Sequence, residues 1–308
     1  MRVTSRAVVL ARGLGTRMRE PDPAVTLTAE QHRAANAGLK PMVPVHGRPF
    51  LEYVLGAVAD AGIRQVALIV APDHLVIRRH FEEHAPSRLA ISFVVQAEAL
   101  GTANAVLAAE QWTGGEPFLV MNADNLYPVQ ALADLASLDE PGLLAFEADD
   151  LVRTGNIPAA RVKAFALVQT DDDGYLMRIV EKPNDLPSEG GSHEIQQGRG
   201  SHETQQGGGS HTQQKSHTQQ NPVASAFRRK DLLVSMNCWR FDARILGACR
   251  DVPRSSRGEF ELPEAVMLAM TRGVRFRTLH ARGPVLDLSR RADMIDLARR
   301  LETASPRP

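Results

Sequence analysis

A glycine-rich loop follows the first apolar run of this chain and ends in a cation. Gly13 and Gly15 are separated by one residue, and Thr16 and Arg17 come directly after them. Glycine has no Cβ, so main-chain N–H groups in such a loop can approach a bound anion closely. The guanidinium of Arg17 is a permanent, forked donor suited to phosphate oxygens. The pattern predicts a polyphosphate site, with a plain strand-to-helix turn as the alternative.

Two common phosphate-binding motifs are excluded by the residues around this loop. A P-loop closes with Gly-Lys-Ser or Gly-Lys-Thr, whereas Thr16 and Arg17 follow Gly15 here. A dinucleotide-binding fingerprint requires a third glycine at the position of Met18. The reaction must therefore be inferred from residues elsewhere in the chain.

Further polar residues stand at the ends of apolar runs that are typical of strands. Gln96 closes one run, and Asp124 lies just beyond residues 118–121. A carboxylate there is a hard oxygen ligand of the kind that Mg²⁺ takes together with substrate phosphates. Ligands of open α/β sheets bind beyond the carboxyl ends of the strands, so we expect the loop, Gln96 and Asp124 to share one crevice.

The first half of the chain alternates short apolar runs with helical periodicity. Strands are predicted at 7–10, 65–70, 91–96, 117–122 and 142–147, and helices at 49–61, 73–83, 102–110 and 129–138. This alternation is typical of parallel strands joined by right-handed crossovers. We expect an α/β fold of Rossmann-like type, with a mostly parallel central sheet and helices on both faces.

The second half has the character of a smaller, β-rich portion. Strands are predicted at 164–170, 175–181, 232–241 and 274–279, and helices at 262–272 and 290–301. An Asp-Gly turn between the first two strands favours a hairpin.

An imperfect Gly-Ser-His-Gln repeat occupies residues 191–220. Its few apolar side chains cannot offset the entropy of ordering, so we expect a disordered insertion at about 186–221 within a single domain spanning 1–308. Its regularly repeated histidines leave weak metal chelation as the alternative; they are His193, His202, His211 and His217.

Composition and charge exclude several classes of function. Thirty-six basic and 36 acidic residues give a formal net charge of zero, so no global attraction to nucleic acid or to an anionic membrane is expected. No apolar run approaches the roughly 20 residues that span a bilayer, and the start lacks a signal-peptide hydrophobic region. Cys238 and Cys249 are too few for a disulfide framework. We expect a cytoplasmic protein without nucleic-acid or membrane partners, and a homo-oligomer is left open.

The motifs together resemble those of the sugar-1-phosphate nucleotidylyltransferases, which include the glucose-1-phosphate thymidylyl- and uridylyltransferases. The matching residues are Leu10-Ala11-Arg12-Gly13-Leu14-Gly15-Thr16-Arg17, Lys40-Pro41-Met42-Val43-Pro44-Val45, Gln96, Thr102-Ala103, Asn122-Ala123-Asp124 and Glu181-Lys182-Pro183. The chain departs from the family at Arg12, where a small residue is usual. It also has a longer segment at 19–39, for which we expect a lid or an extra helix.

The resemblance implies attack of a sugar-1-phosphate oxygen on the α-phosphorus of a nucleoside triphosphate, with UTP or dTTP favoured. It implies roles for the following residues: Arg17, Lys40 and Lys182 as catalytic cations; Ala11, Gly13, Gly15, Thr16, Gln96, Gly101 and Thr102 as nucleotide-binding residues; Glu181 and Asn237 as sugar-binding residues; and Asp124 and Asp287 as Mg²⁺ ligands. Arg17 and Lys40 would face the triphosphate, and Lys182 the sugar phosphate.

Several of these residues have a structural alternative. Thr102 could be a plain helix N-cap, and Lys40 a solvated surface lysine. Glu181-Lys182 could be a surface ion pair. Asp287 keeps only the aspartate of the family's second metal motif, so it could instead cap the helix predicted to begin near Arg290.

Two other functions stay open at this stage. The same fold transfers nucleotidyl groups to phosphorylated amino alcohols such as phosphocholine, but Glu181 and Asn237 favour a sugar. A catalytically silent paralogue that binds nucleotide sugars to regulate a partner is suggested by Arg12 and the reduced motif at Asp287. The retained cations and Asp124 disfavour it. No left-handed repeat domain follows residue 308, so we expect no second, acyltransferase activity.

Overall fold

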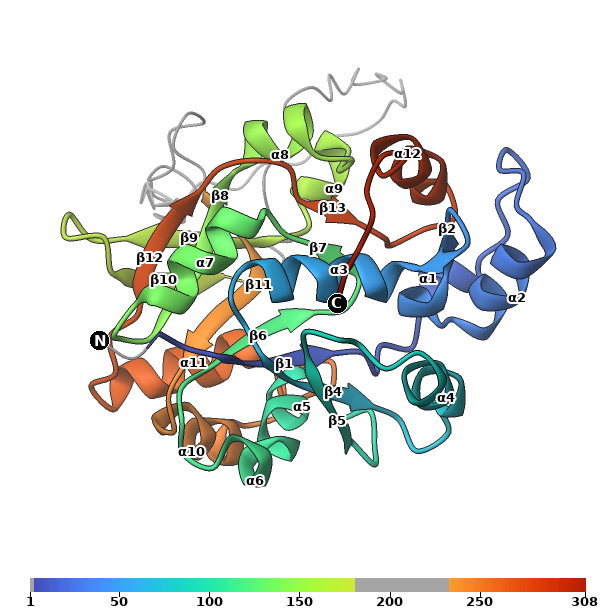
Figure 1. Ribbon diagram of the computed structural model, residues 1–308. Coiled ribbons are helices and arrows are strands. Elements are labelled where there is room, and N and C mark those ends of the chain that lie inside the picture. Colours follow the sequence, from blue (N-terminus) through green and yellow to red (C-terminus); the bar gives the residue numbers. More distant parts are fainter. Residues whose placement is uncertain (1–2, 181–232) are drawn as a thin grey trace, which may run out of the picture. The chain divides into compact units, whose positions relative to one another are not determined.

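The computed structural model describes residues 3–180 and 233–308, and every structural statement below concerns these residues (Figure 1). Their centre is a nine-stranded sheet. One half of it is parallel, in the order β5 (Ala90–Val95), β4 (Gln65–Val70), β1 (Arg6–Leu10) and β6 (Phe118–Asn122). Each of these strands lies within one residue of its predicted position, because each is a short apolar run bounded by turn residues.

The other half of the sheet is largely antiparallel. Its central strand, β11 (Leu233–Phe241), runs antiparallel to β6, to β8 (Gly142–Glu147) and to β9 (Ala166–Thr170). The hairpin predicted at the Asp-Gly turn is present, since β9 pairs antiparallel with β10 (Leu176–Val180). The last strand, β12 (Arg277–Ala281), runs parallel to β8. The predicted α/β class is confirmed, and the sheet is mixed and only partly parallel.

Alternation along the strands divides the core into two layers. In β1, Ala7 and Val9 face one apolar cluster and Val8 faces the other, because successive side chains of a strand point to opposite faces. The first cluster packs against α3 (Phe50–Asp60), α4 (Leu75–Glu83), α7 (Val129–Ser137) and α12 (Asp293–Arg300). The second packs against α5 (Thr102–Ala108), α10 (Arg244–Asp251) and α11 (Leu262–Thr271), so helices cover both faces as predicted (Figure 1).

The remaining elements are mostly one or two turns long and gave no periodic signal. They are α1 (Thr16–Arg19), α2 (Ala29–Ala37), the 3-10 turn Lys40–Met42, α6 (Glu110–Thr113), α8 (Ala148–Thr154), α9 (Ala159–Val162), β2 (Pro44–Val45), β3 (Arg48–Pro49), β7 (Asn125–Leu126) and β13 (Leu286–Asp287). Helix α2 is the extra helix expected before Lys40, and Thr28 and Gln31 form a capping box at its start. None of the described helices is long and apolar enough to cross a membrane.

Both cysteines are buried free thiols, as the low cysteine count indicated. Burial raises the pKa of Cys249 to about 12 and also raises that of Cys238. Neither thiol is therefore a candidate nucleophile.

Candidate functional site

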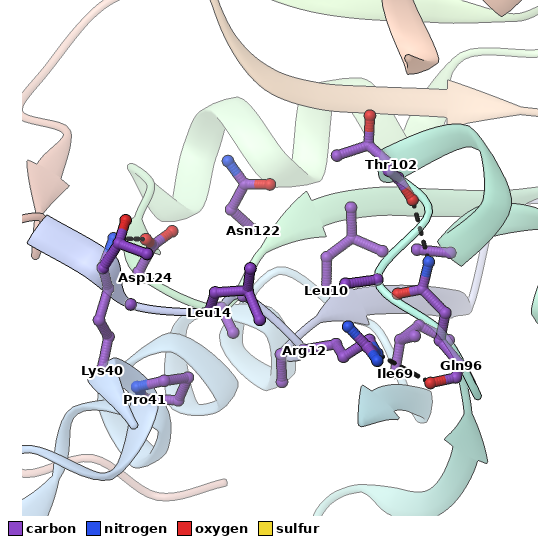
Figure 2. Close-up of a pocket in the computed structure, with 18 of the residues that line it drawn as sticks. Leu10, Arg12, Leu14, Lys40, Pro41, Ile69, Gln96, Thr102, Asn122 and Asp124 are labelled. Atoms are coloured by element: carbon purple, nitrogen blue, oxygen red, sulfur yellow. Dashed lines mark hydrogen bonds and ion pairs between the residues drawn. The ribbon is translucent and has the colours of Figure 1, made fainter. Parts of the chain in front are cut away.

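A pocket of about 410 Å³ opens at the carboxyl ends of β1 and β6 (Figure 2). The convergence predicted from the sequence is observed: the glycine loop, the end of β5 and the segment after β6 all line it. The predicted site residues that it brings together are Ala11, Gly13, Gly15, Thr16, Arg17, Lys40, Gln96, Gly101, Thr102 and Asp124. Asn237 and Asp287 do not line this pocket, and Glu181 and Lys182 lie outside the described residues.

The glycine loop depends on glycine at one position in particular. Gly15 has φ 61° and precedes the first residue of α1, and a Cβ on it would collide with the carbonyl oxygen of Gly38. Any other residue would therefore displace α2 from the loop. Gly13, by contrast, has open space around it, which leaves room for a ligand.

Arg17 is exposed at the rim of the pocket. It forms no hydrogen bond or ion pair with another residue in the part of the chain that the structure describes. Its guanidinium is thus available to an anionic ligand, which is the property that its predicted role requires.

Arg12 turns away from the glycine loop and reaches the end of β5 (Figure 2). Its Nε donates to the carbonyl oxygen of Gln96 at 2.8 Å, and Nη2 donates to that of Ala97 at 3.2 Å. The large residue at this position therefore connects two walls of the pocket.

Gln96 is 4% exposed and has a fixed orientation. Its Nε2 donates to the carbonyl oxygen of Gly101 at 3.0 Å and to Oδ1 of Asn104 at 2.9 Å. Both amide hydrogens are engaged, so the Oε1 atom is left as the acceptor for a ligand.

The turn before α5 requires glycine at position 101. Gly101 has φ 100°, and a Cβ there would approach the Phe260 main chain to 2.5 Å. Thr102 is the first residue of α5, whose N-cap is Gly101. Its Oγ1 accepts a 2.9 Å hydrogen bond from the N–H of Leu262 in α11. The capping alternative for Thr102 is therefore wrong.

Lys40 and Asp124 point toward each other across the pocket (Figure 2). Nζ of Lys40 lies 2.9 Å from Oδ2 of Asp124, and the two side chains are 18% and 26% exposed. Pro41 occupies the second position of the 3-10 turn Lys40–Met42 and is buried. Lys40 is thus no solvated surface lysine.

Asp287 lies beside the pocket in a buried polar cluster with Asn125, Ser289 and Arg161, which we call the closed corner. Asp287 lies on β13, opposite Asn125 of β7, and is 4% exposed. Its Oδ1 accepts hydrogen bonds from Asn125 Nδ2 at 2.9 Å and Ser289 Oγ at 3.2 Å. Its Oδ2 accepts from Arg161 Nη1 at 2.6 Å. Burial and the nearby Asp124 carboxylate raise the pKa of Asp287, and Arg161 opposes this rise.

The helix-capping alternative for Asp287 is also wrong. Helix α12 begins at Asp293, and no side chain caps it at Ala292. The N–H groups of Ser289 and Arg290 bond instead to Oδ2 of Asp293, at 2.8 and 2.7 Å.

Asn237 connects this corner to the sheet. It has a positive φ of 59° at an irregularity of β11, where the register shifts between Ser235 and Trp239. Its Nδ2 donates to Oδ1 of Asn122 at 2.7 Å, and Asn122 lines the pocket. Its Oδ1 accepts from the indole of Trp239, which is fully buried, as expected of a core residue.

The two carboxylates predicted as metal ligands differ in how well they fit Mg²⁺. Asp124 faces the pocket and its Oδ1 has no hydrogen-bond partner among the described residues, so it can hold a cation together with phosphate oxygens. Both oxygens of Asp287 are already engaged. The described residues contain no group of three or more His, Cys, Asp or Glu side chains arranged for a metal ion.

Sequence reasoning missed the residues that hold these segments in place. Buried Arg291 donates from Nε to the carbonyl oxygen of Met18 at 3.0 Å and from Nη2 to Oδ1 of Asn36 at 2.6 Å. It thereby joins α1 and α2 to the C-terminal segment. Arg161 and Asn156 hold Asp287 in a similar way. Partners so far apart in sequence leave no local signal.

Comparison with known proteins supports the resemblance inferred from the motifs. The glucose-1-phosphate thymidylyltransferase of Streptomyces antibioticus is 27% identical over 98% of this chain and 68% of its own length. The UTP–glucose-1-phosphate uridylyltransferase AglF of Haloferax volcanii is 24% identical over 96% of both chains.

A crystal structure of UDP-glucose pyrophosphorylase complexed with UDP-glucose has the same fold. It superposes with a TM-score of 0.64 at 16% identity, covering 98% of this chain and all of the other. The model of the family described as "Nucleotidyl transferase" matches residues 6–199. With its motifs, fold and pocket in agreement, the chain belongs to the nucleotidyl transferase family.

Proposed function

We propose that the protein transfers a nucleotidyl group from a nucleoside triphosphate to a sugar 1-phosphate, giving an NDP-sugar and pyrophosphate. One observation carries the proposal: a single pocket combines the glycine loop, Arg17 and Lys40 with Asp124. Both reactants are anions, so catalysis depends on in-line positioning and on neutralisation of charge. The names of the two relatives that match almost all of this chain state this class of reaction.

On the triphosphate side, Arg17 and Lys40 would neutralise the departing pyrophosphate. Main-chain N–H groups of the loop around Gly13 and Gly15 would donate to the phosphates. Asp124 would hold the Mg²⁺ that stabilises charge on the phosphates when it is bound. Lys40 contacts Asp124 directly and so is placed to move to a phosphate oxygen nearby.

On the base side, we propose UTP or dTTP, as the motif resemblance implies. The Oε1 acceptor of Gln96 suits a ring N–H donor such as N3–H of uracil or thymine. Adenine and cytosine carry an unprotonated nitrogen at the corresponding edge, whereas N1–H of guanine also donates, so this contact by itself disfavours ATP and CTP. Gly101 lets the base approach the main chain closely.

On the sugar side, we propose that Asn237 and Glu181 bind hydroxyl groups and that Lys182 binds the phosphate. Asn237 reaches the pocket through Asn122. One of the two reasons for the silent-paralogue alternative no longer holds. The Arg12 side chain bonds to the carbonyl oxygens of Gln96 and Ala97 and so connects two walls of the pocket.

Pyrophosphate release tests the proposal. The purified protein is assayed with each of UTP, dTTP, CTP, ATP and GTP against a panel of sugar 1-phosphates and phosphocholine, with Mg²⁺. We expect turnover with UTP or dTTP and at least one sugar 1-phosphate. Release with phosphocholine alone would replace the sugar in the proposal, and no release with any pair would refute it. An Asp124→Asn preparation controls for contaminating activity.

A further inference from the structure

We infer that Arg161 holds Asp287 out of the metal site, so that Asp124 is the one carboxylate of residues 3–180 and 233–308 that binds Mg²⁺. The inference rests on the proposed function, since it concerns the metal of that reaction. It assigns Arg161 and Asp287 a positioning role beside the pocket in place of the ligand role that the sequence motif implies for Asp287.

Arg161 is fixed between two buried carboxylates. Its Nη1 lies 2.6 Å from Oδ2 of Asp287, and Nη1 and Nη2 both contact Asp293, at 3.0 and 2.7 Å. The side chains of Arg161, Asp287 and Asp293 are 14%, 6% and 5% exposed. Asp293 also accepts the main-chain N–H groups of Ser289 and Arg290, just before α12, which stabilise part of its own charge. Arg161 is therefore the cation that neutralises Asp287.

The main chain around Asp287 is restrained as well. Asn156 bonds to it twice, accepting from its N–H at 2.7 Å and donating to its carbonyl oxygen at 2.8 Å. To coordinate a cation, Asp287 would have to give up Arg161 or its two Oδ1 donors. Either loss would leave buried polar groups without partners.

A single carboxylate is sufficient for this metal. Mg²⁺ keeps several waters and is commonly bound by one or two carboxylates together with substrate phosphates. Asp124 provides one carboxylate that faces the pocket.

In this arrangement Asp287 positions other side chains instead of binding the metal. It accepts from Asn125, whose Oδ1 accepts from Asn122, and Asn122 in turn bonds to Asn237. Asp287 thereby orients a row of amides that ends at the proposed sugar side of the pocket.

Metal affinity separates the two roles. Mn²⁺ replaces Mg²⁺ as the probe, and free Mn²⁺ is measured by electron paramagnetic resonance with and without the non-hydrolysable analogue α,β-methylene-UTP. Asp124→Asn is expected to weaken Mn²⁺ binding by about tenfold or more, and Asp287→Asn by less than about threefold. Asp296→Asn is the matched control, because this α12 carboxylate has a side chain that is 45% exposed. Because Asp287 is proposed to orient amides of the sugar side, Asp287→Asn should also raise KM for the sugar phosphate with little change in KM for the nucleotide.

Equal weakening of Mn²⁺ binding in the Asp124 and Asp287 variants would overturn the inference and leave the proposed function standing. No Mn²⁺ uptake by the unaltered protein with nucleotide would refute the metal part of the proposed function and the inference with it. If circular dichroism shows that Asp287→Asn does not fold, the triple variant Arg161→Met/Asp287→Asn/Asp293→Asn replaces it. That variant removes the charge of Arg161 together with those of both its partners.

Discussion

Asp124 and Asp287 lie near one another, yet the structure gives them opposite surroundings. Asp124 is open to the pocket, and among the described residues its ionic partner is Lys40. Asp287 is buried, and each of its oxygens has a partner. An exposed carboxylate can exchange its partner for a ligand at small cost, whereas a buried one loses hydrogen bonds that nothing replaces. Residue type alone therefore does not decide which aspartate takes part in the reaction.

The largest effect on stability is expected in the closed corner. Arg161→Met leaves Asp287 and Asp293 buried without their shared cation, and it should lower the free energy of unfolding by about 3 to 5 kcal/mol. Urea denaturation measures this loss. Arg153→Met is the matched control, because Arg153 also pairs with an aspartate but is 76% exposed, so its loss should cost less than about 1 kcal/mol. Equal free energies of unfolding for the two variants would show that the buried Arg161 pairs contribute no more than the exposed Arg153 pair, which would contradict the proposed difference between the closed corner and the pocket.

The largest effect on catalysis is expected in the open pocket. Asp124→Asn should reduce kcat by roughly 100-fold or more, because a charge-stabilising contact of the transition state is lost. Its free energy of unfolding should change by no more than about 1 kcal/mol, since only a partly exposed ion pair is removed. Steady-state rates at saturating Mg²⁺ and urea denaturation measure both quantities. A near wild-type rate would show that the metal assignment is wrong.

A smaller effect separates the two ligands within the pocket. Arg17→Ala should weaken binding of the triphosphate, and Lys182→Ala should weaken binding of the sugar phosphate. Each loss should be about 1.5 to 3 kcal/mol of binding free energy, for one lost charge-assisted contact. KM values for both substrates measure the difference, and Arg33→Ala, an exposed arginine of α2, is the control. If both variants raised KM for the same substrate alone, the proposed orientation of the ligands would be refuted.

The smallest effect is expected from excision of residues 191–220. Val180 and Leu233, which flank residues 181–232, lie close together. Val180 pairs with Leu167 and Leu233 pairs with Val168 on the same strand, β9. Val180 and Leu233 are therefore separated by two strand spacings, roughly 10 Å. Loop entropy changes slowly with length, so stability should change by no more than about 1 to 2 kcal/mol, with little change in turnover.

The repeated histidines provide the opposing hypothesis for this segment. Thermal midpoints and pyrophosphate release are compared for the full chain and the deletion variant, each with and without zinc. A large loss of activity, or a zinc-dependent midpoint found only in the full chain, would show that the repeat is functional.

Motif residues that are marked by a local sequence pattern were predicted well. The β1 strand, the glycine loop and the Gln96 strand end were placed correctly because apolar runs, glycines and strand ends carry local signals. Because ligands of open α/β sheets bind beyond the carboxyl ends of the strands, the sequence also predicts that these segments share one crevice.

The sequence by itself determined the α/β class, the family and the residues that gather around the phosphate pocket, because these follow from local patterns and ordered motifs. Only the tertiary structure decided that the sheet is mixed, that Thr102 bonds to α11, and that Asp287 is paired with Arg161. These features depend on contacts between segments far apart in the sequence. The separation is 126 residues for Arg161 and Asp287 and 160 for Thr102 and Leu262, and β11 pairs with β8 across the four described elements that lie between Glu147 and Leu233. Burial and charge pairing at such distances are properties of the folded chain, so no local pattern could have specified them.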